Sequence, residues 1–329
     1  MAAKKTSKTQ STQIRRALEP EGPVISREEF LAFKNPKGDV IVEIGGRSVA
    51  LTSLDRIYWP QEKISKFELL SYYLQIWPLI KPFLEDRPAI LQRYPRGINA
   101  PKFFQHDLQH APAYVRTVKM LNEQGREIDY AVYTDLPSLL YLVNLGTIEQ
   151  HPWHSRVQDI THPDWLVLDL DPRGAPWRNV LKVAGVARKV METRGLRAYP
   201  KTSGSSGIHL YLPLQLKHDY EQVADFAHRL AEEIVSRVPE LSTVERAIAG
   251  RRKGQVYVDW LQNAKGKSMV SPYSVRAKPG GTVSMPLTWE NLEQGVKISD
   301  FTLKNVPELI QEHGNAWERF FEDRQRLDF

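Results

Sequence analysis

The sequence predicts an α+β fold in which helices flank an antiparallel or mixed sheet. Segments with the alternation of strands are interspersed with amphipathic helical segments. Two pairs of strand-like runs are joined by short turns of small residues, at Gly45-Gly46 and around 202–207, as in β-hairpins. Strands joined by such turns run antiparallel, so part of the sheet is expected to be antiparallel.

Composition indicates a globular protein with a sizeable core. The chain has 329 residues, 41% hydrophobic and 26% charged. No run approaches the roughly 20 apolar residues of a membrane helix, and the N-terminus lacks the apolar part of a secretory signal. The absence of cysteine excludes disulfides, thiolate zinc sites and a cysteine nucleophile, and fits the cytoplasm. A net charge of +6 is compatible with nucleic-acid binding but is not specific for it.

The chain divides into an arm and a folded unit. Residues 1–22 are basic and polar, which predicts a disordered arm that contacts phosphate or serves as a solubilising tail or linker. Residues 23–329 are expected to fold. We expect an N-terminal part at 23–135, a core at 136–310 and a C-terminal helix at 305–329.

The elements follow from alternation, capping residues and breakers. Ser65 is a suitable N-cap for an amphipathic helix over about 66–76, and Asp135 is one for a leucine-rich helix over 136–149. A run of β-formers at 165–171 is stopped by Pro172. Further strands are expected at 40–44, 47–51, 89–94, 114–119, 128–133, 196–201, 208–214 and 255–259, and further helices over about 177–193 and 219–237.

Two carboxylates one residue apart end the strand at 165–171. Alternate strand residues face the same way, so Asp169 and Asp171 share one side, about 7 Å apart at their backbones. A hard cation such as Mg²⁺ or Mn²⁺ would relieve their repulsion. In a purely structural interpretation, which stays open, both side chains cap the turn before Pro172.

A third carboxylate, Asp259, ends another strand-like run. If the two runs are neighbours in one sheet, the three acids converge. Two metal ions held ~3.5–4 Å apart could then activate an attacking hydroxyl and stabilise a leaving pyrophosphate, which is the chemistry of nucleotidyl transfer.

A turn of small residues and an aromatic pair favour a nucleotide ligand. Ser-Gly-Ser-Ser-Gly at 203–207 offers backbone N–H groups and hydroxyls to a triphosphate, although such turns are common. His209 could donate to a phosphate or be a structural histidine. Phe103 and Phe104 lie in an apparent loop, where they could stack on bases or anchor the loop in the core. Walker A, dinucleotide-binding, nucleophile-elbow and His-Glu-x-x-His motifs are missing.

Several spaced motifs, in order, resemble one known family. They are Asp-Leu-Asp-Pro at 169–172, Lys-Thr-Ser-Gly-Ser-Ser-Gly-Ile-His at 201–209, Val-Asp-Trp-Leu-Gln-Asn at 258–263 and Ser-Pro-Tyr-Ser-Val-Arg at 271–276, with upstream matches at 51–60, 103–106 and 151–156. Together they resemble the polymerase domain of bacterial DNA ligase D, of the archaeo-eukaryotic primase superfamily. The resemblance covers about residues 40–310. It implies a primase-like core with an RRM-like sheet and a smaller N-terminal α/β subdomain.

The resemblance also implies a function. Such domains extend a primer on a template at gaps and broken DNA ends that carry a 5′-phosphate, within non-homologous end joining. Ku and DNA ligase are the implied partners, with no membrane and a cytoplasmic location at the nucleoid. The implied cofactor is Mn²⁺, or Mg²⁺, with two ions per active site. The implied substrates are NTPs or dNTPs, with ribonucleotides often favoured.

The residue roles implied by the resemblance follow its motifs. The metal ligands and catalytic residues would be Asp169, Asp171 and Asp259. The nucleotide would be contacted by Phe103, Phe104, Lys201, Ser203, Ser205, His209, Gln262 and Arg276. The 5′-phosphate would be held by Arg56 and Lys66, and the primer or partner end by His151, Arg251, Arg252 and Lys253. Many relatives have Lys where this chain has Ser206, so one phosphate contact would be lost or supplied by Lys201.

Two other classes of function stay open. A module that tethers DNA ends with little catalysis would not need the three carboxylates. A metal-dependent nuclease or phosphoesterase could use three acids but needs no triphosphate-binding turn. The sequence therefore favours the polymerase over both.

Overall fold

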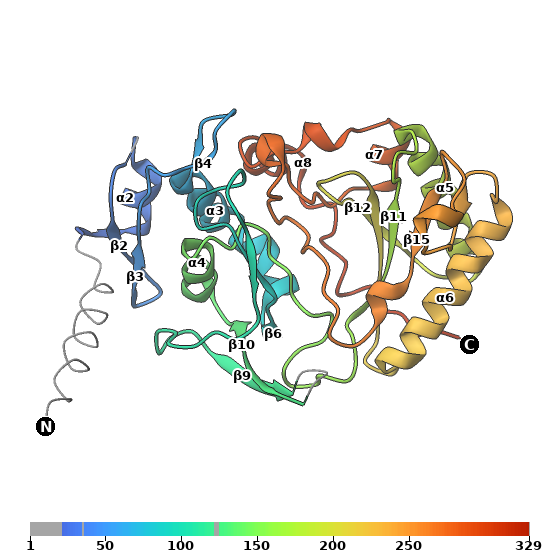
Figure 1. Cartoon of the computed structure of the whole chain (residues 1–329), viewed down its shortest axis with the longest axis horizontal. Helices are drawn as coiled ribbons and strands as arrows, with labels where there is room; N and C mark the ends of the chain where they lie inside the picture. The colour runs from blue at the N-terminus through green and yellow to red at the C-terminus, as the bar shows by residue number, and fades with distance from the viewer. Residues whose placement is uncertain (1–21, 35, 122–124, 329) are drawn as a thin grey trace, which may run out of the picture.

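The computed structural model describes residues 22–328, apart from residue 35 and residues 122–124. The expected basic arm at 1–22 therefore lies, except for Gly22, outside the described residues. Figure 1 shows the hairpin of β2 (Val40–Ile44) and β3 (Arg47–Leu51) at one end of the molecule, and the helices α5 (Trp177–Thr193) and α6 (Tyr220–Arg237) at the other.

As far as the structure describes it, the N-terminal part is built from short strands and three helices. Besides the β2–β3 hairpin it contains β1 (Val24–Ser26), α2 (Arg27–Ala32), β4 (Ile57–Trp59), β5 (Ile64–Ser65), α3 (Lys66–Leu84), β6 (Arg87–Pro88), β7 (Leu91–Arg93), β8 (Phe103–Gln105), β9 (Thr117–Leu121), β10 (Glu127–Tyr133) and α4 (Leu136–Asn144). Two three-stranded sheets have the orders β1-β2-β3 and β6-β10-β9, and β4-β5 and β7-β8 form two-stranded sheets. Ser65 and Asp135 are the N-caps of α3 and α4, as predicted, and each forms a capping box.

The C-terminal part is organised around one five-stranded sheet. Its remaining elements are β11 (Trp165–Asp171), β12 (Tyr199–Thr202), β13 (Ile208–Pro213), β14 (Ser242–Thr243), η1 (Ile248–Gly250), β15 (Val256–Asp259), η2 (Leu261–Asn263), η3 (Pro279–Gly281), α7 (Trp289–Glu293), η4 (Ile298–Asp300) and α8 (Val306–His313). The strand order is β12-β13-β11-β15-β14, antiparallel except for the parallel pair β14–β15. The predicted α+β fold with a mixed sheet is confirmed.

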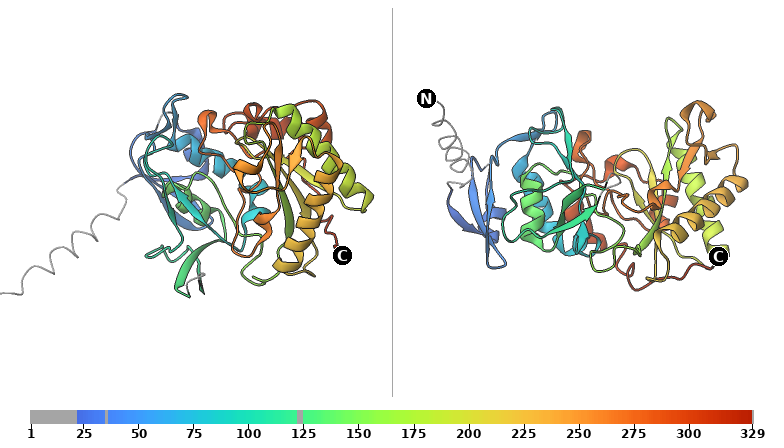
Figure 2. Two further views of the ribbon diagram at one scale, coloured as in Figure 1. Left: turned by 45° about the vertical axis from the view of Figure 1, so that its right-hand side comes forward. Right: turned by 60° about the horizontal axis from the view of Figure 1, so that its bottom comes forward.

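Each face of the five-stranded sheet has its own environment. The fully buried side chains of Leu166, Leu168 and Leu170 alternate along β11 with Val167 and the two acids. Helices α5 and α6 pack on the sheet on the side away from the N-terminal part (Figure 2). Trp165, at the start of β11, packs against Phe83 of α3 and so joins the two parts.

Three predicted helix ends are wrong, each for a long-range reason. The helix from Lys66 continues past Pro78 to Leu84, because its last turns bury Phe83 against Trp165; that burial, roughly 1.5–3 kcal/mol per large apolar side chain, offsets the hydrogen bonds that proline removes. The helix expected to reach residue 149 ends at Asn144, before Gly146 takes a φ of 94°.

The C-terminal helix expected at 305–329 spans Val306–His313 and stops at Gly314, whose φ is 80°. Beyond it Trp317 and Phe320 pack into the core in irregular chain. The Phe103–Phe104 segment, expected to be a loop, is strand β8 paired with β7. No helix in the described part of the chain is long and apolar enough to cross a bilayer.

Candidate active site

Four polar residues form a row across four adjacent strands of the central sheet. Lys201 of β12 is the register partner of His209 of β13, which is the partner of Asp169 of β11, which is the partner of Asp259 of β15. Register partners project from the same face, and Asp171, two residues after Asp169, shares it. The fold therefore gathers the three predicted acids on one face of the sheet.

The central carboxylate of this row is strongly perturbed. Burial, followed by the charges of Asp171 and Asp259, raises the pKa of Asp169 to about 7. Its Oδ1 lies 3.5 Å from Nε2 of His209. Burial and the two neighbouring acids thus disfavour the ionised form of Asp169.

The outer carboxylates are engaged by neighbours. Asp171 pairs with Arg173 (Oδ2 to Nε, 2.8 Å), and Asp259 accepts from Leu261 N–H and Gln262 Nε2, both at 2.9 Å. Across residues 22–328, leaving out 35 and 122–124, no three His, Asp or Glu side chains lie in a position to hold one metal ion.

The chemistry of the donor set nevertheless fits a divalent cation. Three carboxylates supply only oxygen ligands, and a cation between them would offset both the burial and the neighbouring charges that raise the pKa of Asp169. The metal site stays a prediction.

Lys201 lies behind His209, which differs from the direct nucleotide contact predicted for it. The Lys201 side chain is fully buried, and its Nζ lies 2.8 Å from Nδ1 of His209 and contacts Oγ of Ser284. Burial and the nearby Arg276 lower its pKa well below the usual lysine value. Nδ1 of His209 is thereby occupied, and Nε2 is the nitrogen that faces the acids.

In the Ser-Gly-Ser-Ser-Gly turn at 203–207, the hydroxyl of Ser203 accepts the hydrogen bonds of the backbone amides that follow it. Oγ of Ser203 accepts from the N–H groups of Ser205, Ser206 and Gly207 at 2.9–3.1 Å. The amides expected to form an anion nest therefore point to Ser203. Ser205 and Ser206 are exposed.

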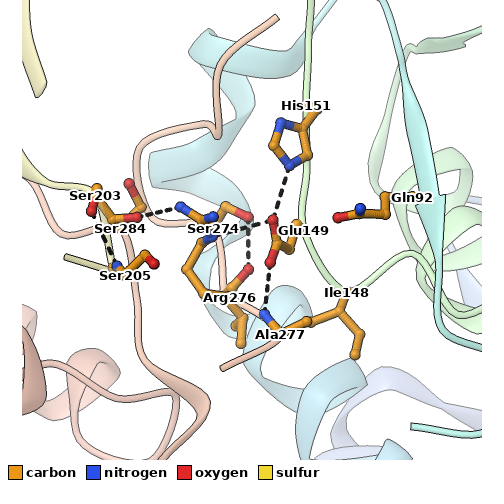
Figure 3. Close-up of polar contacts among 12 residues, drawn as sticks. Gln92, Ile148, Glu149, His151, Ser203, Ser205, Ser274, Arg276, Ala277 and Ser284 are labelled. Atoms are coloured by element: carbon orange, nitrogen blue, oxygen red, sulfur yellow. Dashed lines mark hydrogen bonds and ion pairs between the residues drawn. The ribbon is translucent and has the colours of Figure 1, made fainter. Parts of the chain in front are cut away.

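A chain of polar contacts runs from this turn to His151 (Figure 3). Nη1 of Arg276 donates to the carbonyl of Ser203, and its Nε lies 3.2 Å from Oε2 of Glu149. The same oxygen lies 3.0 Å from Nε2 of His151. Predicted nucleotide and DNA contacts are therefore linked through one acid.

Glu149 is the site residue that sequence reasoning missed. It was placed at the end of a predicted helix, where a glutamate needs no special explanation. The signal available was an acid that directly follows the uncharged, largely apolar stretch 136–148, two residues before His151. A charged residue there has to find a buried partner.

The aromatic pair is exposed, which contradicts the core-anchor alternative. Phe103 is 46% exposed and Phe104 62%. Successive strand residues face opposite ways, so the two rings do not present one surface. The Arg93 guanidinium lies 5.2 Å from the Phe103 ring centroid, and Phe104 stacks on His106.

The two predicted 5′-phosphate ligands come from one corner of the N-terminal part. Lys66 at the start of α3 is buried, and its Nζ donates to the Thr52 carbonyl at 2.7 Å. Burial, with the charge of Arg56, lowers the pKa of Lys66 to about 7. Arg56 is exposed and donates to Ser53 Oγ and the Pro95 carbonyl.

The predicted basic loop presents two of its three cations to solvent. Arg252 and Lys253 are exposed. Arg251 stacks on the ring of Tyr257, 3.9 Å from its centroid, and donates to the Glu245 and Arg246 carbonyls. Arg251 therefore holds the loop in shape, whereas Arg252 and Lys253 are the cations accessible to DNA.

The fold, with its central mixed sheet, is that of the primase-polymerase class of proteins. The family model described as LigD, primase-polymerase domain, matches residues 65–317, and the chain belongs to that family.

Known relatives agree with this assignment. The chain is 33% identical over 302 residues to the multifunctional non-homologous end joining protein LigD of Pseudomonas aeruginosa, covering 86% of this chain and 34% of that protein. It is 31% identical over 280 residues to the bifunctional LigD of Bacillus subtilis, covering 83% and 44% respectively. The chain thus spans less than half the length of either relative.

A solved structure shares the fold. The polymerase domain from Mycobacterium tuberculosis ligase D, in complex with DNA, superposes with a TM-score of 0.77 at 27% identity, covering 84% of this chain and 99% of that one.

Proposed function

We propose that this chain is a template-dependent nucleotidyltransferase that adds nucleotides at gaps and broken ends of DNA during non-homologous end joining. The observation that carries the proposal is the register of Asp169 with Asp259, which gathers three carboxylates on one face beside the turn at 203–207. Family membership and the DNA held by the similar M. tuberculosis domain support nucleic acid as the second ligand.

Asp169, Asp171 and Asp259 would hold two Mn²⁺ or Mg²⁺ ions, which when bound would lower the pKa of the primer hydroxyl and stabilise the leaving pyrophosphate. His209, with Nδ1 turned to Lys201, directs Nε2 to the same face and is able to donate to a phosphate from there.

Protein groups around the acids supply binding. Arg276 and the hydroxyls of Ser203 and Ser205 lie where the triphosphate is proposed to bind, and Gln262 borders Asp259. The exposed Phe104 offers a face on which a base can stack. These contacts orient the nucleotide against the primer end.

The remaining proposed contacts concern DNA. Arg56 and Lys66 would bind the 5′-phosphate across a gap, because both cations lie in one corner and, among the residues that the structure describes, neither pairs with an acid. Arg252, Lys253 and His151 would contact the primer strand. A preference for ribonucleotides, and cooperation with Ku and a DNA ligase, are further parts of this proposal.

Primer extension on a gapped duplex with a 5′-phosphate tests the function. We expect template-directed addition with Mn²⁺ or Mg²⁺, each tried with rNTPs and dNTPs, and affinity for DNA that falls as salt rises through counterion release. DNA binding without nucleotide addition under any of these conditions would favour a tethering module. Shortening of the primer would favour a nuclease.

A further inference from the structure

The carboxylate of Glu149 contacts both Arg276, a proposed nucleotide ligand, and His151, a proposed DNA ligand. Its side chain is 5% exposed. Oε2 faces Nε2 of His151 at 3.0 Å and Nε of Arg276 at 3.2 Å, and Oε1 accepts from the Ala277 N–H at 2.9 Å (Figure 3). A carboxylate removed from water needs such partners, and here they come from three different residues.

Glu149 stays ionised at neutral pH. Burial by itself would raise its pKa, but the hydrogen bond from His151 and the charge of Arg276 outweigh burial and hold the pKa below its usual range. An acid that cannot take up a proton near neutrality is not a proton carrier. What it can do is hold donors in place.

On the nucleotide side, the position of Arg276 is passed on to the turn at 203–207. Its Nη1 donates to the Ser203 carbonyl. The Gly204 backbone packs so tightly against the arginine that an added Cβ would lie 2.6 Å from Arg276 Cγ. Arg276 and the turn therefore cannot move independently.

On the DNA side, Glu149 fixes the ring of His151. Because Nε2 faces Glu149, Nδ1 is the ring nitrogen left for another partner. The backbone around Glu149 is itself held, since Tyr73 donates to the Ile148 carbonyl and the Gln150 N–H donates to Ser274 Oγ. The carboxylate is thus mounted on a fixed segment.

We propose that Glu149 is a positioning residue that couples the two substrates: it fixes Arg276, and with it the nucleotide-binding turn, relative to His151 on the DNA side. This inference rests on the proposed function. Loss of the carboxylate removes one anchor of Arg276, and of the turn packed against it, and lets the His151 ring rotate, so the incoming nucleotide is no longer aligned with the primer end.

Glu149→Gln tests the proposal, because it keeps size and removes charge. With the gapped duplex, ATP and MnCl₂, we expect KM for ATP to rise about 10-fold, as for other residues that orient a ligand through a second side chain. Glu293→Gln is the matched control, since Glu293 also pairs with an arginine, Arg188, but is 70% exposed and lies elsewhere on the surface. The KM of the Glu293→Gln variant for ATP should equal that of the wild type.

A double-mutant cycle separates positioning from a general structural effect. If Glu149 acts through Arg276, Glu149→Gln changes KM by less than 2-fold in an Arg276→Ala background. If the full increase persists there, the proposal is overturned. Circular dichroism shows whether each variant folds; if Glu149→Gln does not, Glu149→Asp, which keeps the charge on a shorter side chain, takes its place in the same cycle.

The failure of this inference is distinguishable from failure of the proposed function. A wild-type chain that incorporates ATP, together with a Glu149→Gln variant of unchanged KM, overturns the inference alone. A wild-type chain that neither binds nor incorporates nucleotide overturns both.

Discussion

Asp169 and Asp259 occupy directly opposite positions on the neighbouring antiparallel strands β11 and β15. Side chains at such positions start about 4.5–5.5 Å apart at Cβ, where like charges destabilise a sheet. Asp171 adds a third negative charge to the same face. The fold thus retains a local repulsion that an apolar or neutral residue would remove, as expected where a site serves ligand binding rather than stability.

Asp169→Asn should abolish nucleotide addition and leave DNA binding nearly intact. The substitution removes the central proposed metal ligand, and the loss of several kcal/mol of transition-state stabilisation corresponds to a rate decrease of about 10³-fold or more. Primer extension and DNA affinity on the same gapped duplex measure the two effects. Near-normal extension by the variant would contradict the metal assignment.

The same variant should be more stable than the wild type when metal is removed by EDTA, and increasingly so as pH rises. The unfolded Asp169 ionises near pH 4, whereas the folded one, with its pKa raised to about 7, ionises later. The cost of burying the ionised carboxylate beside two other acids is therefore absent below pH 4, grows between pH 4 and 7 and is complete above 7. We expect a difference in unfolding free energy of up to about 4 kcal/mol at pH 8, because folding raises the pKa of Asp169 from near 4 to about 7.

Urea unfolding at pH 4.5, 6 and 8 measures this difference, with Asp225→Asn, an exposed carboxylate on α6, to correct for net charge. If the difference in unfolding free energy between Asp169→Asn and the wild type does not vary with pH, ionisation of Asp169 has no effect on folding.

Local patterns predicted much of the catalytic sheet but not its register. Alternation and the stop at Pro172 define β11, and period two places both of its acids on one face. Nothing in the local sequence pairs Asp169 with Asp259, because the two strands are far apart in the chain and their alignment depends on packing of the whole sheet. The proximity of Asp169 and Asp259 therefore follows from the sheet as a whole and not from the local sequence.

Residues whose position depends on distant contacts escaped prediction. The leucine-rich pattern that predicts a helix lies before Asn144; beyond it Gly146 adopts a left-handed conformation where its backbone approaches Pro95, and Tyr73 donates to the Ile148 carbonyl. Glu149 thus leaves the helix and enters the site. Such contacts override helix propensity and leave no mark in a local window.

Lys66 should make recognition of a 5′-phosphate depend on pH. Its pKa is about 7 in the free protein, chiefly because it is buried, and a bound phosphate favours the ammonium form. Above pH 7 binding has to recruit a proton, so the preference for a phosphorylated over an unphosphorylated gap should shrink between pH 7 and 9, by up to about 10-fold per pH unit.

Fluorescence anisotropy with the two DNA gaps measures that preference. Lys66→Met should lose the preference at every pH, whereas Lys81→Met, at the exposed far end of the same helix, should keep it. Equal affinity of the wild type for both gaps would remove Lys66 from phosphate recognition.

Gly204→Ala should destabilise the chain far more than Gly45→Ala, although both glycines have left-handed φ values, of 65° and 58°. At Gly45 an added Cβ meets nothing within 4 Å, so the cost is the backbone strain alone, about 1–2 kcal/mol. At Gly204 the Cβ would lie 2.6 Å from Arg276 Cγ and 2.9 Å from the Ser284 amide nitrogen, which adds about 1–3 kcal/mol of overpacking. Urea unfolding of the two variants gives the comparison directly. Equal losses of stability would mean that the turn and Arg276 can shift apart at little cost. Their close packing would then impose no constraint on the nucleotide site.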